Sequence, residues 1–236
     1  MLTNLFSRRK RQIGYVGKSK MSKTSYSQCG EDLIVDYVFR LRGVTRPSYI
    51  DIGANHPYFL SNTAKFYIEG SRGINIDANP LAIVEFEKER KDDINLNVGI
   101  GPYETELEFF IFDDSTLSTF SKEEAERISQ SGKHRIESTK KVKVTTIGKV
   151  ISEYNKDQFP DFFSLDVEGL DFEILKSVDF KKYSPKIICV EAAEYSPIGA
   201  GKRKEYIIEY LKNQGFYEYG NTNLNSIMLK SEFWFI

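Results

Sequence analysis

The sequence predicts an α/β fold in which helices cover both faces of a mostly parallel, doubly wound sheet. Short runs rich in β-branched and aromatic residues alternate with segments of helical periodicity over most of the chain, which is typical of repeated strand–helix–strand units. The runs are apolar almost throughout, as expected of strands buried on both faces. A length of 236 residues fits one domain of this kind with some additions.

The elements follow one another in a regular order. The first helix is expected after Gln28 and before Gly43, with an apolar stripe formed by Leu33, Ile34, Tyr37, Val38 and Leu41. Strands are expected at 48–54, 73–77, 94–100, 107–112, 142–147, 162–167, 186–192, 216–220 and 226–231. Further helices are expected at 59–69, 80–90, 121–131, 147–155, 170–178 and 202–214. A short polar turn joins the last two strands, which predicts an antiparallel hairpin at the edge of the sheet.

Charge is distributed unevenly along the chain. The net charge is −1, and 40% of the residues are hydrophobic, which excludes intrinsic disorder. Residues 1–24 contain seven Lys and Arg and no acid. We expect residues 1–25 to form a mobile basic tail and residues 26–236 to form a single domain. The acidic remainder argues against a nucleic-acid partner, while residues 1–24 suit peripheral contact with an anionic membrane.

The two cysteines, Cys29 and Cys189, form neither a disulfide scaffold nor a metal-binding pattern. No apolar run has the roughly 18–20 residues that a membrane span needs. At the start of the chain the basic cluster follows a short apolar stretch, whereas in a secretory signal the basic residues come first. We therefore expect a cytoplasmic protein with reduced thiols, in which residues 1–24 allow peripheral contact at the inner membrane surface.

Acidic side chains stand at the ends of the first two strands, where open parallel sheets bind their ligands. Asp51 and Asn55 flank Gly53 after the first strand, and Asp77 ends the second. Asp77 is placed to accept hydrogen bonds from ribose hydroxyls. The stretch 53–58 has a single glycine and a proline, unlike the G-x-G-x-x-G of dinucleotide sites. An acid before the glycine favours a cationic sulfonium cofactor over a pyrophosphate.

The motifs resemble the FkbM-type S-adenosylmethionine-dependent methyltransferases. They are YSQCGEDLIVDYV at 26–38, DIGAN, GINIDANP and SLDVEGLDFEIL. The resemblance covers the chain from about Tyr26 to the last strand. It implies the Rossmann-like class I methyltransferase fold, with a seven-stranded sheet and an antiparallel C-terminal strand. It also implies O-methylation of a small-molecule or glycan acceptor, of the surface-polysaccharide or secondary-metabolite type. The alternatives are a Rossmann-type NAD(P)-dependent oxidoreductase and a non-catalytic adaptor that binds the cofactor at the membrane surface.

The resemblance also implies a cofactor site for S-adenosylmethionine. The first strand end would line the cofactor, the second would hold the ribose, the third would lie near the adenine, and the opening motif would fold over the methionyl end. The residues at these four places are Asp51, Gly53 and Asn55; Asp77 and Ala78; Asn97 and Val98; and Gln28 and Glu31. The chain departs from the family where Asp77 replaces the more frequent Glu and where His56-Pro57 replaces small residues.

Three acids at the ends of two later strands are candidates for catalysis. An alcohol acceptor needs a general base or a metal ion, because it is a poor nucleophile while protonated. We expect Asp166 or Glu168 to take the hydroxyl proton or to orient the sugar. Asp166 with Glu191 could instead hold a divalent cation such as magnesium, although we favour the metal-free base. The third reading is that these acids only cap the following helix.

Three further features have two readings each. His56 has the titration range of a base but also suits a hydrogen-bonded turn. Segment 113–121, DDSTLSTFS, is either a lid that recognises the acceptor or a plain connector. Residues 202–204 are basic and either bind a phosphate or form a solvated helix face.

Overall fold

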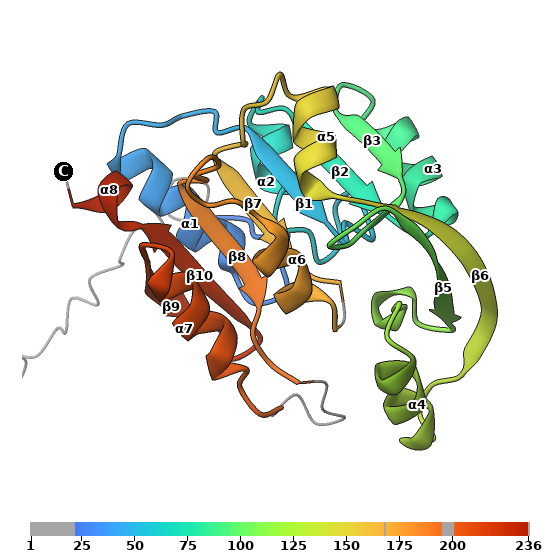
Figure 1. The fold of residues 1–236 in the computed structure, drawn as a ribbon. Helices are drawn as coiled ribbons and strands as arrows, with labels where there is room; N and C mark the ends of the chain where they lie inside the picture. Colours follow the sequence, from blue (N-terminus) through green and yellow to red (C-terminus); the bar gives the residue numbers. More distant parts are fainter. Residues whose placement is uncertain (1–21, 168, 195–200, 236) are drawn as a thin grey trace, which may run out of the picture.

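The computed structural model describes residues 22–167, 169–194 and 201–235 and has two sheets within them. The main sheet has seven strands, and β10 is the one that runs antiparallel to both of its neighbours (Figure 1). Its strands, in spatial order, are β3 (Ile94–Asn97), β2 (Gly73–Asp77), β1 (Tyr49–Ile52), β7 (Phe162–Leu165), β8 (Ile187–Glu191), β10 (Asn225–Lys230) and β9 (Phe216–Asn221). The predicted fold class, with its mostly parallel sheet and C-terminal antiparallel strand, is confirmed.

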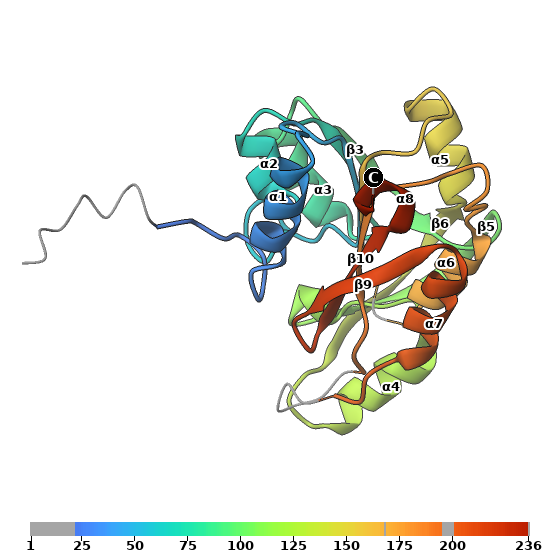
Figure 2. The same ribbon diagram turned by 90° about the vertical axis from the view of Figure 1, so that its left-hand side faces the viewer.

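Helices cover both faces of this sheet (Figure 2). One layer contains α1 (Glu31–Leu41), α2 (Ala64–Ile68) and α3 (Pro80–Glu89), and the other contains α5 (Ile147–Tyr154), α6 (Asp171–Ser177) and α7 (Glu205–Asn213). Successive strand residues serve opposite faces, as the two-residue period requires: Tyr49 packs in the core beside α1, whereas Ile50 packs in the core beside α5 and α6. A short C-terminal helix, α8 (Ser231–Trp234), which the sequence pattern did not predict, follows β10.

A second, three-stranded sheet forms an arm beside the main one. It has the order β4 (Gly99–Ile100), β6 (Ile136–Thr145) and β5 (Thr105–Phe112). Between β5 and β6 the chain carries the short helix η2 (Ser115–Leu117) and α4 (Lys122–Gln130), and α4 lies at the far end of the arm (Figure 1). The predicted strand at 94–100 is therefore two strands, β3 and β4, which belong to different sheets.

Two helices differ from their predicted form. The helix expected at 59–69 is limited to Ala64–Ile68. In α1 the predicted stripe is rotated, because Tyr37 and Leu41 are 49% and 55% exposed while Val35 and Phe39 are buried. The buried face also holds Asp32, which accepts hydrogen bonds from Ser25, Tyr26 and Ser27. Counting apolar residues misses a carboxylate that is buried together with its partners.

In the part of the chain that the structure describes, no helix combines the length and the apolar character needed to cross a bilayer. The predicted basic tail lies outside the described residues as far as residue 21.

Candidate functional site

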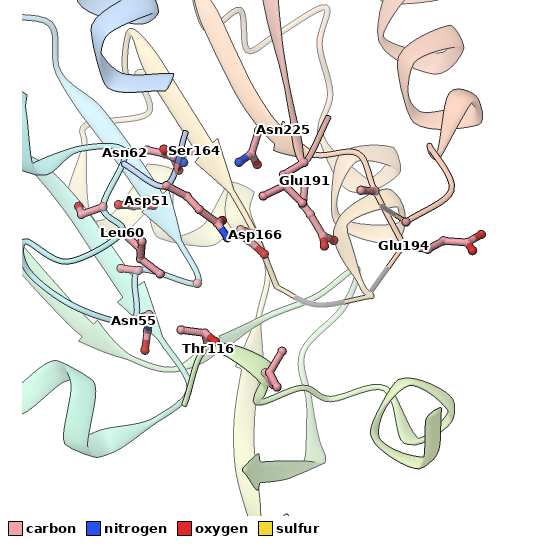
Figure 3. Close-up of a pocket in the computed structure, with 18 residues that line it drawn as sticks. Asp51, Asn55, Leu60, Asn62, Thr116, Ser164, Asp166, Glu191, Glu194 and Asn225 are labelled. Atoms are coloured by element: carbon pink, nitrogen blue, oxygen red, sulfur yellow. Dashed lines mark hydrogen bonds between the residues drawn. The ribbon is translucent and has the colours of Figure 1, made fainter. Parts of the chain in front are cut away.

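Two adjoining cavities open at the carboxyl ends of the parallel strands. The larger, about 270 Å³, lies over β1, β7 and β8 and is drawn in Figure 3. The smaller, about 50 Å³, lies over β1 and β2 and is lined by the predicted ribose residues Asp77 and Ala78. The two cavities share four lining residues, which are Gly53, Asn55, Thr116 and Asp166. They therefore form one crevice with two ends.

Gly53 lets the end of β1 approach the end of β7. Its φ of +80° lies in the left-handed region, and a Cβ atom there would overlap the backbone carbonyl of Asp166. Glycine is the residue that meets both demands. Asn55 also has a positive φ, +51°, and its backbone N–H donates to Asp77 Oδ2 at 2.8 Å. The DIGAN motif thus links the end of β1 to the end of β2.

Asp51 is buried at the floor of the larger cavity. Its Oδ2 accepts a hydrogen bond from Thr63 Oγ1 at 2.7 Å, and burial raises the pKa of its carboxyl above the ordinary value. Thr63 Oγ1 in turn accepts from Arg90 Nη1 at 3.0 Å. Because the guanidinium donates to Thr63, the hydroxyl proton is left for Asp51.

Arg90 is fully buried behind this contact and was not among the predicted site residues. Its guanidinium pairs with Asp93 at 3.0 Å and donates to Tyr49 Oη at 2.7 Å. The sequence pattern contains no clear sign of this network, because an Arg near a helix end usually reaches solvent. The i,i+3 spacing of Arg90 and Asp93 was the one available hint.

Asp77 is held by two backbone N–H groups, from Asn55 at 2.8 Å and Asn79 at 2.7 Å. Burial, together with the negative charge of Asp51, raises its pKa to about 6. Each carboxylate oxygen has two lone pairs, so both keep acceptor capacity for ribose hydroxyls. The residues thus fit the ribose of the predicted cofactor.

The predicted adenine residues have different positions. Val98 lines the smaller cavity together with Phe109 and Phe120, whose rings lie 4.7 Å apart. Asn97 is not among the lining residues and instead donates to the backbone carbonyls of Asp77 and Ala78, at 2.9 and 3.1 Å. It therefore fixes the loop after β2. The aromatic pair comes from the arm, and sequence reasoning did not connect it with this site.

The two predicted residues of the opening motif have different positions: one lines the larger cavity and the other supports a lining residue. Gln28 lines the larger cavity. Glu31 is fully buried and is not among the lining residues. It accepts hydrogen bonds from Thr222 Oγ1 at 2.7 Å and from Asn225 Nδ2 at 3.0 Å, and Asn225 does line the cavity.

Asp166 stands where the two cavities meet. Burial, followed by the negative charge of Asp171, raises its pKa to about 7, against the opposing effect of Lys204. Burial also raises the pKa of Glu191, whose Oε2 lies 2.5 Å from Lys204 Nζ. Several buried acids thus share one cation, so the group holds a proton near neutral pH.

The predicted metal pair, Asp166 and Glu191, already has Lys204 as a cationic neighbour. In the ranges that the structure describes, no group of three or more His, Cys, Asp or Glu side chains has an arrangement suited to a metal ion. Lys204 belongs neither to a solvated helix face nor to a phosphate site, because it pairs with Glu191. The other predicted acid, Glu168, lies outside the described residues.

His56 is not among the residues that line either cavity. Its Nδ1 accepts hydrogen bonds from the backbone N–H groups of Tyr58 and Phe59, at 3.0 and 2.9 Å. Its Nε2 lies 3.5 Å from Glu85 on α3. In this arrangement the ring stabilises the turn after DIGAN.

Segment 113–121 forms the roof of both cavities. Thr116 and Leu117 line the larger cavity, and Ser115 and Phe120 line the smaller. Ser115 Oγ donates to Asn55 Oδ1 at 3.0 Å, which joins the roof to the loop after β1. Two residues 60 positions apart in the sequence thus meet across the crevice.

Comparisons with known proteins agree with this geometry. The methyltransferase FkbM domain model matches residues 51–217, which confirms the resemblance drawn from the motifs and favours a methyltransferase over the oxidoreductase alternative. No curated protein matches the sequence significantly.

Solved structures are similar in fold at low sequence identity. A protein assigned as a caffeoyl-CoA O-methyltransferase from Staphylococcus aureus superposes with a TM-score of 0.50 at 10% identity, over 88% of this chain and 85% of that one. A 1,6-didemethyltoxoflavin-N1-methyltransferase from Burkholderia thailandensis, solved with S-adenosylhomocysteine, has a TM-score of 0.43 at 9% identity, over 86% and 77%.

Proposed function

The chain belongs to the FkbM methyltransferase domain family and is an S-adenosylmethionine-dependent methyltransferase, and from this premise we propose that it methylates a hydroxyl group of a sugar or glycan. The observation that carries the proposal is Asp166, a carboxyl with a pKa of about 7 at the junction of the two cavities. A base works best when its pKa lies near the working pH.

The residues of the smaller cavity suit the adenosine part of the cofactor. In this proposal Asp77 and Ala78 hold the ribose, and Val98, Phe109 and Phe120 lie beside the adenine. Asp51, Gly53, Asn55 and Gln28 then serve the methionyl part in the larger cavity. Asn97 supports the loop after β2 from behind, whereas Glu31 supports Asn225. When bound, S-adenosylmethionine supplies an electrophilic methyl group on a positively charged sulfur.

The acids of the larger cavity suit a hydroxyl acceptor. Asp166 accepts the hydroxyl proton, and Lys204 stabilises the negative charge of the neighbouring carboxylates. Glu191 pairs with Lys204, which keeps that ammonium group in place. Positive charge from a lysine reduces the need for a metal ion here, since its ammonium already offsets part of the carboxylate charge. Glu168 stays a second candidate for the base on sequence grounds alone.

The proposal is tested with labelled cofactor and a glycan extract. The purified protein is incubated with [methyl-¹⁴C]S-adenosylmethionine and a cell-surface glycan extract, and the labelled product is identified by mass spectrometry. We expect a mass gain of one methylene on a hexose or deoxyhexose, located at an oxygen. Label on protein, lipid or nitrogen only would overturn the acceptor class. Asp166→Asn serves as the matched inactive control.

The basic residues 8–23 support peripheral contact with an anionic membrane as an accompanying proposal. The full chain should co-sediment with vesicles containing phosphatidylglycerol at low salt and release at high salt. A variant with Gln in place of Arg8, Arg9, Lys10 and Arg11 should bind less, and equal binding would contradict this role.

A further inference from the structure

Asn225 has a buried acceptor atom that no other described residue satisfies. It is the first residue of β10, is 4% exposed and lines the larger cavity. Its Nδ2 donates to Glu31 Oε1 at 3.0 Å, but its Oδ1 has no hydrogen-bond partner in the described part of the chain. Leaving a buried acceptor unpaired is destabilising, so this oxygen favours a ligand that brings a donor.

Glu31 determines which end of the Asn225 amide faces the cavity. Burial raises the pKa of Glu31, but hydrogen bonds from Thr222, from the Cys29 backbone N–H and from Asn225 hold it below its ordinary value. Glu31 is therefore ionised at neutral pH. An ionised carboxylate only accepts hydrogen bonds, so Asn225 must turn its NH₂ group toward Glu31. The amide oxygen is then the end of the side chain that has no partner in the described part of the chain.

The position of Asn225 points to the acceptor rather than to the cofactor. In the sheet order β1-β7-β8-β10, Asn225 lies opposite Glu191 and three strands from Asp51. At a strand spacing of about 4.8 Å, three strands span roughly 14 Å. Asp77, at the adenosine end, lies on the other side of β1. Asn225 thus belongs to the end of the crevice beyond Asp166 (Figure 3).

The charge of this end restricts what it can bind. Among the described residues that line the larger cavity there is no Lys, Arg or His, whereas four acids line it: Asp51, Asp166, Glu191 and Glu194. Lys204 stands behind Glu191, with its ammonium group in the ion pair. A carboxylate or phosphate on the acceptor would face these four acids, and no cationic side chain among the described lining residues would offset its charge. Like charges in a partly buried site repel strongly.

We propose that Asn225 Oδ1 accepts a hydrogen bond from a second hydroxyl of the acceptor, and that this part of the acceptor is an uncharged sugar rather than a uronic acid or a sugar phosphate. Glu31 is a positioning residue that acts through Asn225. The inference rests on the proposed function, because it takes the larger cavity to be the acceptor site.

The charge of the acceptor is tested with the glycan extract separated by anion exchange into neutral and acidic fractions. Each fraction is incubated with the wild-type protein and [methyl-³H]S-adenosylmethionine, and a portion of the acidic fraction is first carboxyl-reduced to remove uronic acids. We expect label in the neutral fraction and a gain in the acidic fraction after reduction. Label confined to the untreated acidic fraction would overturn the inference. Absence of label from every fraction would instead reject the proposed function.

Asn225→Leu and Glu31→Gln test the residues. Asn225→Leu should lower labelling at least about tenfold, equivalent to 1.4 kcal/mol, while calorimetric affinity for S-adenosylhomocysteine stays unchanged. In Glu31→Gln, the new side-chain NH₂ group can donate to Asn225 Oδ1, which would reverse the orientation of the Asn225 amide. This variant should raise the acceptor KM and leave the cofactor KM and kcat near wild type. Asn213→Leu, an exposed position on α7, is the matched control.

The outcomes separate the two roles. If Asn225→Leu labels glycans as wild type does, or weakens S-adenosylhomocysteine binding as much as it lowers labelling, the assignment of Asn225 to the acceptor is wrong. If Asn225→Leu does not fold, Glu31→Gln decides, because it keeps a hydrogen-bonding partner for Asn225 and Thr222. An unchanged acceptor KM in Glu31→Gln would then refute the inference.

Discussion

The chemistry of the site depends on how single carboxyl groups are surrounded. Asp51, Asp77 and Asp166 all stand at strand ends, yet each has different partners: a threonine hydroxyl, two backbone N–H groups, and neighbouring charges. Burial raises the pKa of all three, to about 6 for Asp77 and about 7 for Asp166. The pKa of Asp166 is thus close to neutral pH, which suits a base.

Asp166→Asn should lower kcat by a factor of about 10²–10⁴, the usual contribution of a general base, with little change in S-adenosylhomocysteine affinity. The wild-type rate should rise with pH through about 7, as the proton leaves Asp166. The variant should lack this rise. A steady-state pH profile checks both points, and an unchanged kcat would remove Asp166 from the mechanism.

The same substitution should change the pH dependence of stability. The pKa of Asp166 rises from 3.8 to about 7 on folding, so the folded state holds a proton that the unfolded state releases. Stability is thus lost as pH rises from about 4 through 7. Asp166→Asn removes this loss, so its Tm should exceed that of wild type at pH 8 and match it near pH 4. Thermal melts at both values measure the difference, and a constant offset would argue against the raised pKa.

Gly53 tests the close approach of β1 and β7. Gly53→Ala should destabilise the protein by more than about 3 kcal/mol, because the positive φ and the overlap with the Asp166 carbonyl both oppose a Cβ atom. Gly148→Ala is the matched control: it lies in α5 with open space around it, and should stabilise by about 0.5–1 kcal/mol. Urea unfolding compares the two, and equal effects would contradict the steric argument.

At the scale of elements, the sequence predicts well what depends on neighbours along the chain. The buried strands at 49–52, 162–165 and 187–191 lie within the predicted runs, because a parallel strand covered on both faces must be apolar throughout. The prediction failed where distant contacts decide. The run 94–100 breaks at Val98 because its two halves pair in different sheets, and no local pattern reports the partner strand.

The site residues divide in the same way, into those that the local sequence predicts and those that depend on distant contacts. The positions of Gly53, Asp77 and Asp166 could be predicted because each residue ends a strand or follows one directly, at the edge where such sheets bind ligands. The bonds of Arg90 to Thr63, of Asn225 to Glu31 and of Lys204 to Glu191 could not, since each joins different elements of the fold. His56 was considered for its chemistry, but two neighbouring backbone N–H groups occupy its Nδ1.

Arg90→Met tests how far the network behind Asp51 stabilises α3 and β1. It should cost about 3–5 kcal/mol, because it leaves the buried Asp93 without its cation. It should also weaken S-adenosylhomocysteine binding, since Thr63 loses the donor that directs its proton to Asp51. Arg72→Met is the control, because Arg72 also stacks on Tyr67 but pairs with the exposed Asp92. It should cost less than about 1 kcal/mol, and a similar loss in both variants would refute the buried-pair argument.

At the scale of the whole molecule, the crevice lies between two bodies, the main sheet and the arm, whose hydrophobic cores differ in size. The floor belongs to the main sheet, whose core continues into helices on both faces. The roof belongs to the arm, where Phe112, Leu117, Ala125 and Ile128 form a small separate cluster. Small clusters with few buried apolar contacts are the ones that open at low free energy. The arrangement therefore places the more easily opened body over the ligand.

Hydrogen exchange measures this difference. In the free protein, the amides of Phe110 and Thr119, which bond across the base of the roof, should exchange faster than those of Phe162–Leu165 in β7. S-adenosylhomocysteine should slow the roof amides at least about tenfold and leave β7 nearly unchanged, because a ligand that contacts both bodies must dissociate before the roof opens. Ser115→Ala removes the contact with Asn55 and should speed exchange in the free protein more than in the complex. Equal protection of roof and floor, with or without the ligand, would mean that the two bodies open together.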